Sequence, residues 1–318
     1  MIDYSDEYKE IVAAYEESGG KRNNLLNKNL ASLVINGNKV LGANSIPGIK
    51  LDVLKRTKNT IKVRVTVKKN SKNLQPIHLC FGMTKEGQQN IISEYILEEN
   101  SYARILAHCS FPDKGKIGHF MNSEITIAKN AKLFYTETHY HGNAGNVTVK
   151  PKANVNIGAG GVYKSNFNLI KGRVGILDID YEVFLEAKAI CELTTKIYAK
   201  ADDKLNIKEV VHLNGKEARS LVMSRAALTD QSYSKFVGET YGNAPAVRGH
   251  IDCTEVLENE AQAVAIPIVN VKDKSAKVTH EAAIGSLDRV QIETLMARGL
   301  TRKEATDFII QGLLRETT

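Results

Sequence analysis

The C-terminal third of the chain holds a thiol, an imidazole and a carboxylate that could act together on a metal or on sulfur. Cys253 lies in the segment 248–255, and His280 and Glu281 lie in the segment 279–282. If these segments are strands in successive layers of a stacked fold, each layer adds roughly 4.8 Å. A thiolate, an imidazole and a carboxylate gathered near an exposed sheet edge suit a thiophilic metal or sulfur chemistry.

A second group of candidate metal ligands lies near the middle of the chain. Glu137, His139 and His141 are separated by single residues. Residues two apart in a strand point to the same side, so the three side chains would face one way. They could hold a divalent metal in a mononuclear site, or they could belong to a solvated polar ladder along a stack of strands. The sequence leaves both interpretations open.

The other three cysteines have fewer charged or metal-binding residues near them in the sequence. Cys80, Cys109 and Cys191 lie in apolar sequence, although the first two each have a histidine one or two positions away. Free cysteine is commonly buried and inert, so we expect three core residues. No Cys-x-x-Cys pair occurs, which excludes a self-contained zinc or iron–sulfur motif. Four cysteines in 318 residues also exclude a disulfide-rich scaffold.

Several common classes of protein are excluded by what the sequence lacks. No Walker A motif and no Rossmann glycine fingerprint occur, and the glycine-rich residues 158–161 precede strand-like sequence, which favours a tight corner over a phosphate cradle. The formal charge of +7 is spread along the chain, so we expect no nucleic-acid partner. The acidic N-terminus and the lack of a long apolar run predict a cytoplasmic protein without a membrane helix.

The elements that must position the candidate residues are mainly strands. Residues 5–18 carry apolar side chains at three- and four-residue steps, which predicts one amphipathic helix that ends at Gly19. After this helix the period changes to two. Residues 61–67 alternate apolar and polar side chains over their whole length, as a half-buried strand does.

Short polar corners recur between such strands from about residue 124 to residue 280. Most successive corners lie roughly 13 to 22 residues apart, near the short periods of solenoids. Asn-Gly occurs only twice and Asp-Gly not at all, so two-residue hairpins are scarce. The pattern therefore favours a parallel β-helix over a sandwich, although no clear corner lies between residues 216 and 258. The predicted corners are 129–131, 150–153, 171–173, 186–189, 201–203, 214–216, 258–261 and 272–276.

Two short helices are predicted at the C-terminus. Ser286 is a candidate N-cap for a helix over 287–297, which Gly299 closes. Residues 301–304, Thr-Arg-Lys-Glu, form a capping box that opens a second helix. One face of the second helix is predicted to be apolar: Ala305, Phe308, Ile309 and Leu313.

This helical hairpin has two candidate roles. A β-helix needs capped ends, so the hairpin could be a cap. It could instead be a docking surface, with Leu295, Met296 and Ile310 available to a groove of a partner. The composition does not separate these roles.

Three segments of the chain carry a resemblance to a known family. They are Arg-Gly-His-Ile-Asp-Cys at 248–253, Thr-His-Glu-Ala-Ala at 279–283, and the helical sequence 295–312, which contains Met-Ala-Arg-Gly-Leu-Thr, Glu-Ala and Ile-Gln-Gly. In order and spacing they resemble the C-terminal portion of the SufB/SufD family of iron–sulfur cluster assembly proteins, over about residues 224–314. The chain is shorter than the usual SufB, and in this it resembles compact members of minimal systems with one scaffold and one ATPase.

The resemblance implies a fold and its division into parts. It implies a right-handed parallel β-helix core, mainly β, with a C-terminal helical domain, to which the sequence pattern adds the short N-terminal helix and the C-terminal helical hairpin. We therefore expect an N-terminal helical segment over 1–30, a β-helix core over 31–283 and a C-terminal helical segment over 284–318 that docks an ATPase.

The resemblance also implies a cofactor, partners and site residues. In the family, the helical domain docks the ABC-type ATPase SufC, and two β-helix subunits pair along their C-terminal strands. The nascent iron–sulfur cluster forms at that junction, with a cysteine and a glutamate of SufB and a histidine of SufD. By motif these match Cys253, Glu281 and His280. Since one chain holds all three, we expect a homodimer in which Cys253 and Glu281 of one copy face His280 of the other.

The expected function is that of a scaffold, not an enzyme. It would assemble an iron–sulfur cluster transiently, with sulfur from a donor, and pass it to apo-protein acceptors, while a SufC-like ATPase moves the two subunits. One alternative is a structural or regulatory partner of the ATPase that carries no cluster. The other is a carbohydrate-active β-helix enzyme, against which the lack of tryptophan counts. The type of cluster stays open.

Overall fold

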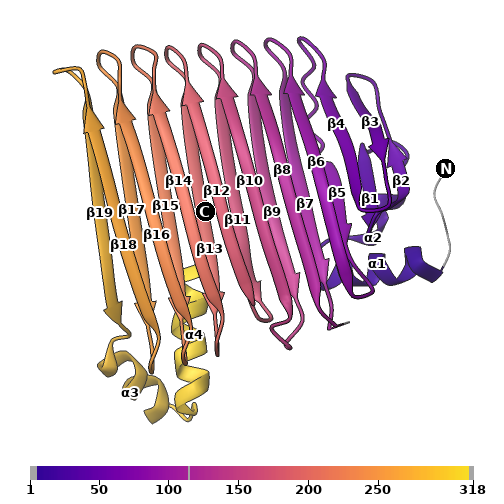
Figure 1. The fold of residues 1–318 in the computed structure, drawn as a ribbon. Coiled ribbons are helices and arrows are strands. Elements are labelled where there is room, and N and C mark those ends of the chain that lie inside the picture. Colours follow the sequence, from indigo (N-terminus) through magenta and orange to yellow (C-terminus); the bar gives the residue numbers. More distant parts are fainter. Residues whose placement is uncertain (1–5, 114, 315–318) are drawn as a thin grey trace.

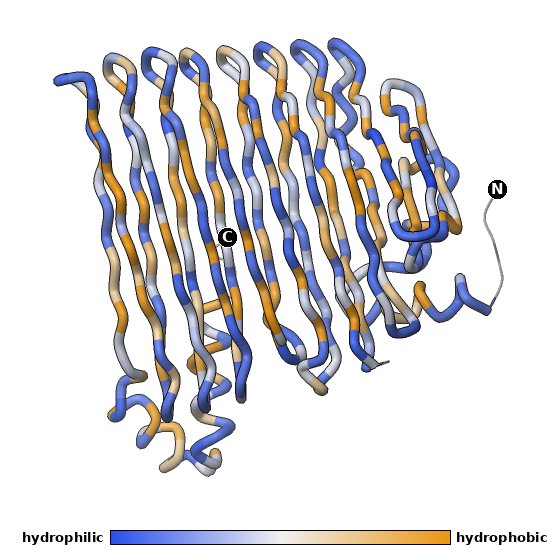
Figure 2. Tube along the Cα trace, in the orientation of Figure 1, coloured by the Kyte–Doolittle hydropathy of each residue, from blue (hydrophilic) through white to orange (hydrophobic). Residues whose placement is uncertain are grey.

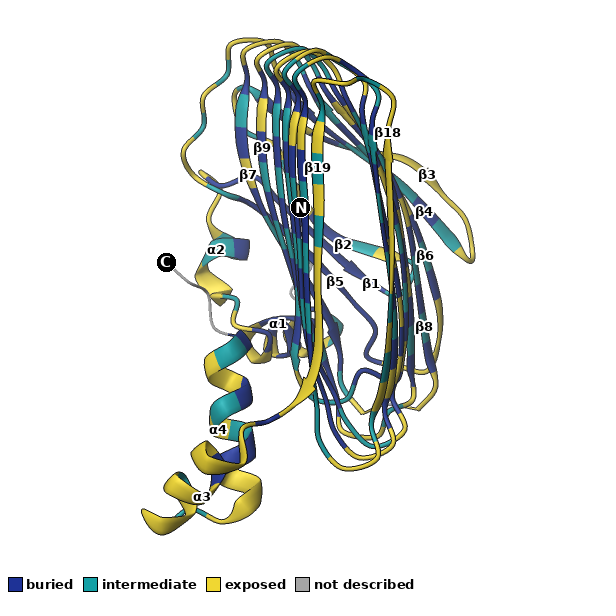
Figure 3. Ribbon diagram, turned by 90° about the vertical axis from the view of Figure 1, so that its left-hand side faces the viewer, coloured by how far each residue is buried: buried dark blue, intermediate teal, exposed yellow. Residues whose placement is uncertain are grey.

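The computed structural model describes residues 6–113 and 115–314 and is mainly β, with 58% strand. The chain winds into a β-solenoid of about eight turns, in which two sheets lie face to face (Figure 1, Figure 3). Short helices precede and follow the strands. The mainly β class, the parallel β-helix, the N-terminal helix and the C-terminal helices are thus confirmed.

Each full turn of the solenoid gives one strand to each sheet, so neighbours within a sheet are mostly alternate strands of the chain, paired in parallel. Of the described strands, the ten-stranded sheet contains β1 (Ser32–Asn36), β2 (Lys39–Asn44), β5 (Ile77–Gly82), β7 (Tyr102–Phe111), β9 (Lys132–His141), β11 (Val162–Lys171), β13 (Ile190–Ala199), β15 (Arg219–Leu228), β17 (Arg248–Leu257) and β19 (Lys277–Ser286). The nine-stranded sheet contains β3 (Ile49–Arg56), β4 (Thr60–Val67), β6 (Gly87–Leu97), β8 (Ile117–Ile127), β10 (Val147–Ile157), β12 (Ile176–Leu185), β14 (Lys204–Leu213), β16 (Tyr233–Gly242) and β18 (Gln262–Val271).

Side chains alternate along each strand between the interior of the solenoid and its surface. Hydropathy alternates in the same way along many strands (Figure 2). Strand β10, for example, buries every second residue from Val147 to Ile157. The inward residues of both sheets form one continuous apolar core. The alternation over residues 61–67 predicts such a strand correctly, because this segment is part of β4.

Asparagines mark equivalent corners of successive turns. Asn70, Asn100 and Asn130 have positive φ angles of 60°, 57° and 58°. The Asn100 Nδ2 atom donates to Asn70 Oδ1, and Asn130 Nδ2 donates to Asn100 Oδ1, each at 3.2 Å. Asparagine tolerates this left-handed conformation better than most residues. These asparagines therefore have two roles. Their backbones bend the chain at each corner, and their side chains link successive turns.

One predicted corner is wrong. Residues 150–153 lie inside β10, where Pro151 is buried and Lys150 and Lys152 are exposed. The inward–outward alternation continues through the proline. Its missing N–H is tolerated because the pairing of β10 with β12 skips Lys150 and Pro151.

The remaining corners lie between strands, as the sequence predicts, except that Lys171 still belongs to β11. The glycine-rich segment 158–161 also lies between strands. The structure adds two corners in the gap that the sequence left between residues 216 and 258. They lie at 229–232 and 243–247, where Asp230 and Ala246 have positive φ angles.

The two ends of the solenoid differ. At the N-terminal end the sheets finish in the antiparallel hairpins β1–β2 and β3–β4, and helices α1 (Asp6–Glu17) and α2 (Arg22–Leu26) cover the outside of the ten-stranded sheet (Figure 3). The helix predicted over 5–18 is therefore α1, although Ser5 lies outside the described residues. At the C-terminal end, which we call the open end, β18 and β19 are edge strands. Large apolar side chains of this last turn are 36–46% exposed: Val264, Ile266, Ile268, Val269, Val271 and Ile284.

Helix α3 (Arg289–Ala297) and helix α4 (Arg302–Leu314) follow β19. The N-cap of α3 is Asp288, whose Oδ1 accepts a hydrogen bond from the Val290 N–H at 2.8 Å. The predicted cap, Ser286, is wrong because this residue still belongs to β19.

The boundary between the two helices follows the prediction. Gly299, with a φ of 100°, follows α3. The capping box of α4 is confirmed, since the Thr301 N–H donates to Glu304 Oε2 at 2.8 Å and the Glu304 N–H donates to Thr301 Oγ1 at 3.3 Å. Residues 315–318 of the predicted C-terminal segment lie outside the described residues.

The helical hairpin packs on the outer face of the ten-stranded sheet, beside β13 and β15, and not over the open end (Figure 3). The cap interpretation is therefore wrong. The buried face of α4 also differs from the prediction, because Phe308 is 58% exposed while Ile310, predicted to be available to a partner, is 1% exposed. Among the described helices, none has the length and apolar character that crossing a membrane requires.

Candidate functional site

Cys253 faces the interior of the solenoid in β17, one turn before the open end. It is 1% exposed and lies in the sheet between Ser224 of β15 and Ala282 of β19. Burial, together with the nearby carboxyls of Glu255 and Glu209, raises the pKa of its thiol to about 12. The thiol is therefore protonated at neutral pH, and a cation that binds it must displace the proton.

His280 lies on the same inner face, in the last turn. It pairs in the sheet with Ile251, two residues before Cys253. The side chain is half-buried, and neither ring nitrogen has a hydrogen-bond partner among the described residues. Burial, and then the nearby imidazole of His250, lower its pKa. A neutral imidazole with an unpaired nitrogen is the form that binds metal.

Glu281 lies on the opposite face of β19. It is exposed and pairs in the sheet with Asp252, which forms an ion pair with Arg225. Successive residues of a strand point to opposite sides. Within one chain, therefore, the structure brings Cys253 and His280 to one face and leaves Glu281 on the other.

Two buried carboxyls near Cys253 were not predicted from the sequence. Glu209 comes from β14 in the opposite sheet, and Glu255 comes from β17 itself. Thr195 Oγ1 donates to Glu209 Oε1 at 2.8 Å, and Ser234 Oγ donates to Glu255 Oε1 at 2.6 Å. The other oxygen of each carboxyl has no hydrogen-bond partner among the described residues.

Burial raises the pKa of Glu209 to about 7 and raises the pKa of Glu255 in the same direction. Both residues interrupt the run of inward apolar positions in an alternating strand. Glu255 is two residues from Cys253, so the two side chains point to the same side of the strand. This spacing could have predicted Glu255 as a neighbour of Cys253.

The mid-chain group lies inside the solenoid. As the alternation predicts, Glu137, His139 and His141 all face inward from β9 and are buried. His139 Nε2 lies 2.7 Å from Glu137 Oε1. His141 does not join this contact directly, because its Nε2 lies 3.3 Å from the far nitrogen of His139, Nδ1. The solvated-ladder interpretation is wrong, since these side chains are enclosed.

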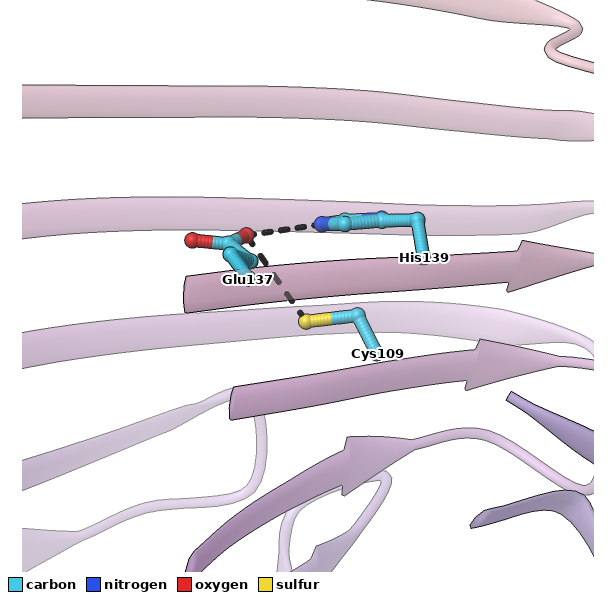
Figure 4. A group of neighbouring side chains, drawn as sticks. All are labelled: Cys109, Glu137 and His139. Carbon is cyan, nitrogen blue, oxygen red and sulfur yellow. Dashed lines mark hydrogen bonds and ion pairs between the residues drawn. The ribbon is translucent and has the colours of Figure 1, made fainter. Parts of the chain in front are cut away.

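Cys109 joins this group in place of His141. In the sheet it pairs with His139, and its Sγ donates to Glu137 Oε1 at 3.8 Å (Figure 4). Burial, and then the Glu137 carboxyl, raise the pKa of the Cys109 thiol well above its ordinary value. The ligand atoms of Cys109, Glu137 and His139 all lie within 4.8 Å of one another. The expectation that Cys80, Cys109 and Cys191 are buried is confirmed. The contact of Cys109 with the Glu137 carboxyl was not predicted from the sequence.

The chain is similar to proteins of one family over nearly its whole length. Residues 84–313 match the family described as SUF system FeS cluster assembly, SufBD core domain. An iron–sulfur cluster assembly SufBD family protein of Methanocaldococcus jannaschii is 43% identical over 310 residues, which cover 97% of this chain and 98% of that protein. A SufBD family protein of Pyrococcus horikoshii is 32% identical over 316 residues, covering 99% of this chain and 96% of the relative.

Proposed function

Because the chain belongs to the SufBD family of iron–sulfur cluster assembly proteins, we propose that it is a scaffold, not an enzyme, on which a cluster is assembled and from which it is passed on. The scaffold works as a homodimer with a SufC-like ABC-type ATPase, receives sulfur from a donor and delivers the cluster to apo-proteins. The observation that carries this proposal is the position of Cys253, one turn from the open, apolar end of the solenoid.

Cys253 accepts sulfur or ligates iron as the thiolate. His280 and Glu281 complete the coordination, and such mixed, weak ligation suits a cluster that must leave. The unpaired nitrogens of His280 support its part as a ligand. Because Cys253 and Glu281 of one chain lie on opposite faces, a site that uses all three residue types draws on both copies of the dimer.

The homodimer forms through the last turn of the solenoid. Edge strands with unpaired N–H and C=O groups and exposed apolar side chains associate readily. Strands β18 and β19 combine both properties, and Ile266, Val269 and Ile284 contribute apolar surface there. A second copy that pairs along these edges would cover this surface and bring two Cys253 thiols to one junction.

The ATPase docks on the helical hairpin. The buried face of α4 anchors the hairpin to the sheet, where Tyr198 Oη donates to Asp307 Oδ1 at 2.6 Å. The outward face still carries Val290, Met296 and Phe308, which are 69%, 42% and 58% exposed. Exposed apolar side chains on a firmly anchored helix are what a partner groove recognises.

The test compares two matched substitutions in protein reconstituted with iron and sulfide without oxygen. Val269→Asp places a charge on the open end, and Val53→Asp places it on a side chain of β3 with nearly the same exposure, 41% against 43%. We expect Val269→Asp to be monomeric by light scattering and to lose most of the cluster absorbance, while Val53→Asp keeps both. A monomer with the full cluster would refute the shared site, and a colourless wild-type protein would favour a regulatory partner without a cluster.

A further inference from the structure

The interior group of Cys109, Glu137 and His139 is a second site, distinct from the Cys253 end. We propose that it binds a single thiophilic divalent transition-metal ion, Zn²⁺ or Fe²⁺, held permanently inside the solenoid. The three ligand atoms come from two neighbouring strands, β7 and β9, and all three side chains are buried. This inference does not depend on the proposed assembly of a cluster.

The three ligand atoms lie close enough together to surround one ion, since all are within 4.8 Å of one another. Zinc lies about 2.3 Å from sulfur and about 2.0–2.2 Å from nitrogen and oxygen, so tetrahedral ligand atoms lie about 3–4 Å apart. The Cys109 Sγ to Glu137 Oε1 distance is 3.8 Å, and the His139 Nε2 to Glu137 Oε1 distance is 2.7 Å. The first distance lies in this range, and the second is a hydrogen-bond distance that must lengthen when an ion takes the place of the shared proton.

Hydrogen bonding orients His139 as a ligand. The Val174 carbonyl can only accept, so His141 Nδ1–H donates to it at 3.1 Å. In a neutral His141, Nε2 must then accept from His139 Nδ1–H, at 3.3 Å. His139 Nε2 is left with a lone pair that faces Glu137 Oε1, which is also an acceptor. Two acceptors at this distance need a proton or a cation between them, and the carbonyl–imidazole support matches that of metal-binding histidines.

A further buried imidazole in the same compartment, His119, has a nitrogen without a partner among the described residues. The Gln89 amide Nε2 donates to the carbonyls of Gly37 and Gly82, so its Oε1 accepts from His119 Nδ1–H at 2.7 Å. His119 Nε2 therefore carries a lone pair, and it is buried without a partner among the described residues. The ring centroid of His119 lies 6.2 Å from that of His139. A buried nitrogen without a partner calls for a ligand.

Charge balance also favours a divalent ion. A thiolate and a carboxylate neutralise M²⁺, so the occupied site carries no net charge in an interior lined by aromatic rings such as Phe111 and Phe167. Binding forms the metal–sulfur bond and releases two protons to solvent, one from the Cys109 thiol and the one shared by His139 Nε2 and Glu137 Oε1. Because the site is enclosed, the ion must enter as the chain folds.

The experiment counts metal in the full chain carrying Cys253→Ser, so that metal at the proposed cluster site does not contribute. The protein is purified without oxygen and without added metal, exposed to a chelator, and then denatured. We expect about one zinc or iron ion per chain, released only on denaturation. Cys109→Ser and His139→Gln should each lower this content at least about tenfold. Cys191→Ser, at another buried cysteine, should leave it unchanged.

Cobalt gives a readout that does not depend on the folding of the Cys109 variant. A chain with Cys80→Ala, Cys191→Ala and Cys253→Ser keeps Cys109 as its one thiol and is refolded with Co²⁺. A sulfur-to-cobalt charge-transfer band that disappears with His139→Gln would support the site. The proposal would be overturned if the Cys253→Ser chain contained no metal and the chain with Cys109 as its one thiol showed no such band. Full metal content in the Cys109→Ser variant would also overturn it. The element count decides between zinc and iron.

Discussion

The Cys109 group and the Cys253 group contain the same residue types in the same kind of strand, but they occupy different places in the solenoid. Cys109 lies in β7, with further turns on both sides, and its neighbours are hydrogen-bonded to one another. Cys253 is followed by one turn only, and the nitrogens of the nearby His280 have no partner among the described residues. We therefore expect position along the solenoid, and not residue type, to separate a site that holds an ion permanently from a site that exchanges a cluster.

The largest expected difference between the two groups is in the reactivity of their thiols. Cys253 should react with a maleimide in the native protein at least about 100-fold faster than Cys109, because fraying of the last turn exposes it while Cys109 needs global unfolding. Mass spectrometry of peptides after timed labelling measures both rates in one sample. Equal rates would remove the distinction between an open end and a sealed interior.

Loss of a carboxylate should also affect the two groups differently. Glu137→Ala leaves the enclosed His139 without its hydrogen-bond partner at Nε2, and we expect the free energy of unfolding to fall by about 3 kcal/mol. Glu281→Ala removes an exposed carboxylate and should cost less than about 0.5 kcal/mol. Urea denaturation of the metal-free proteins measures both values. A small effect of Glu137→Ala would show that this carboxyl is poorly coupled to His139.

The buried carboxyl of Glu209, near Cys253, should make the stability of the protein depend on pH. Burial raises the pKa of Glu209 from 4.5 to about 7, so the native state holds this proton more tightly than the unfolded state. The free energy of unfolding should therefore decrease as the pH rises from 4.5 to about 7, by up to about 3 kcal/mol from this residue. Glu209→Gln should remove this part of the decrease, as measured by urea denaturation at pH 5 and pH 7. An unchanged pH dependence would contradict the assignment.

The smallest expected effect comes from the hydroxyl that supports Glu209. Thr195→Val keeps the shape of the side chain and removes the donor to Glu209 Oε1, and we expect a loss of about 1 kcal/mol in urea denaturation. Thr195→Ser keeps the hydroxyl and should preserve most of the stability. If both variants lose the same amount, packing and not the hydrogen bond explains the effect.

Much of the fold could be predicted because strand alternation and corner composition are local properties. The prediction failed at Pro151, where lysines on both sides of a proline are typical of a corner, although the inward–outward alternation continues through it. It also missed the corner at 229–232, where Asp230 supplies the positive φ that a glycine often provides.

Some contacts between site residues could likewise be predicted from local sequence, and others could not. The shared face of Glu137, His139 and His141 follows from their parity within one strand. The contact between Cys109 and Glu137 depends on the register between β7 and β9, which the length of a full turn sets and which no local pattern reveals. Adjacent residues such as His280 and Glu281 must point to opposite faces of a strand, so the sequence alone could have separated them.

Reconstitution of the cluster in two matched cysteine variants tests the central claim most directly. Cys253→Ser and Cys191→Ser are each treated with iron and sulfide without oxygen, and the visible absorbance and bound iron are compared with those of the wild-type protein. Both cysteines are buried, but only Cys253 lies beside the open end. We predict that Cys253→Ser loses the cluster absorbance and Cys191→Ser keeps it. Wild-type absorbance in Cys253→Ser would contradict assembly at the open end of the solenoid.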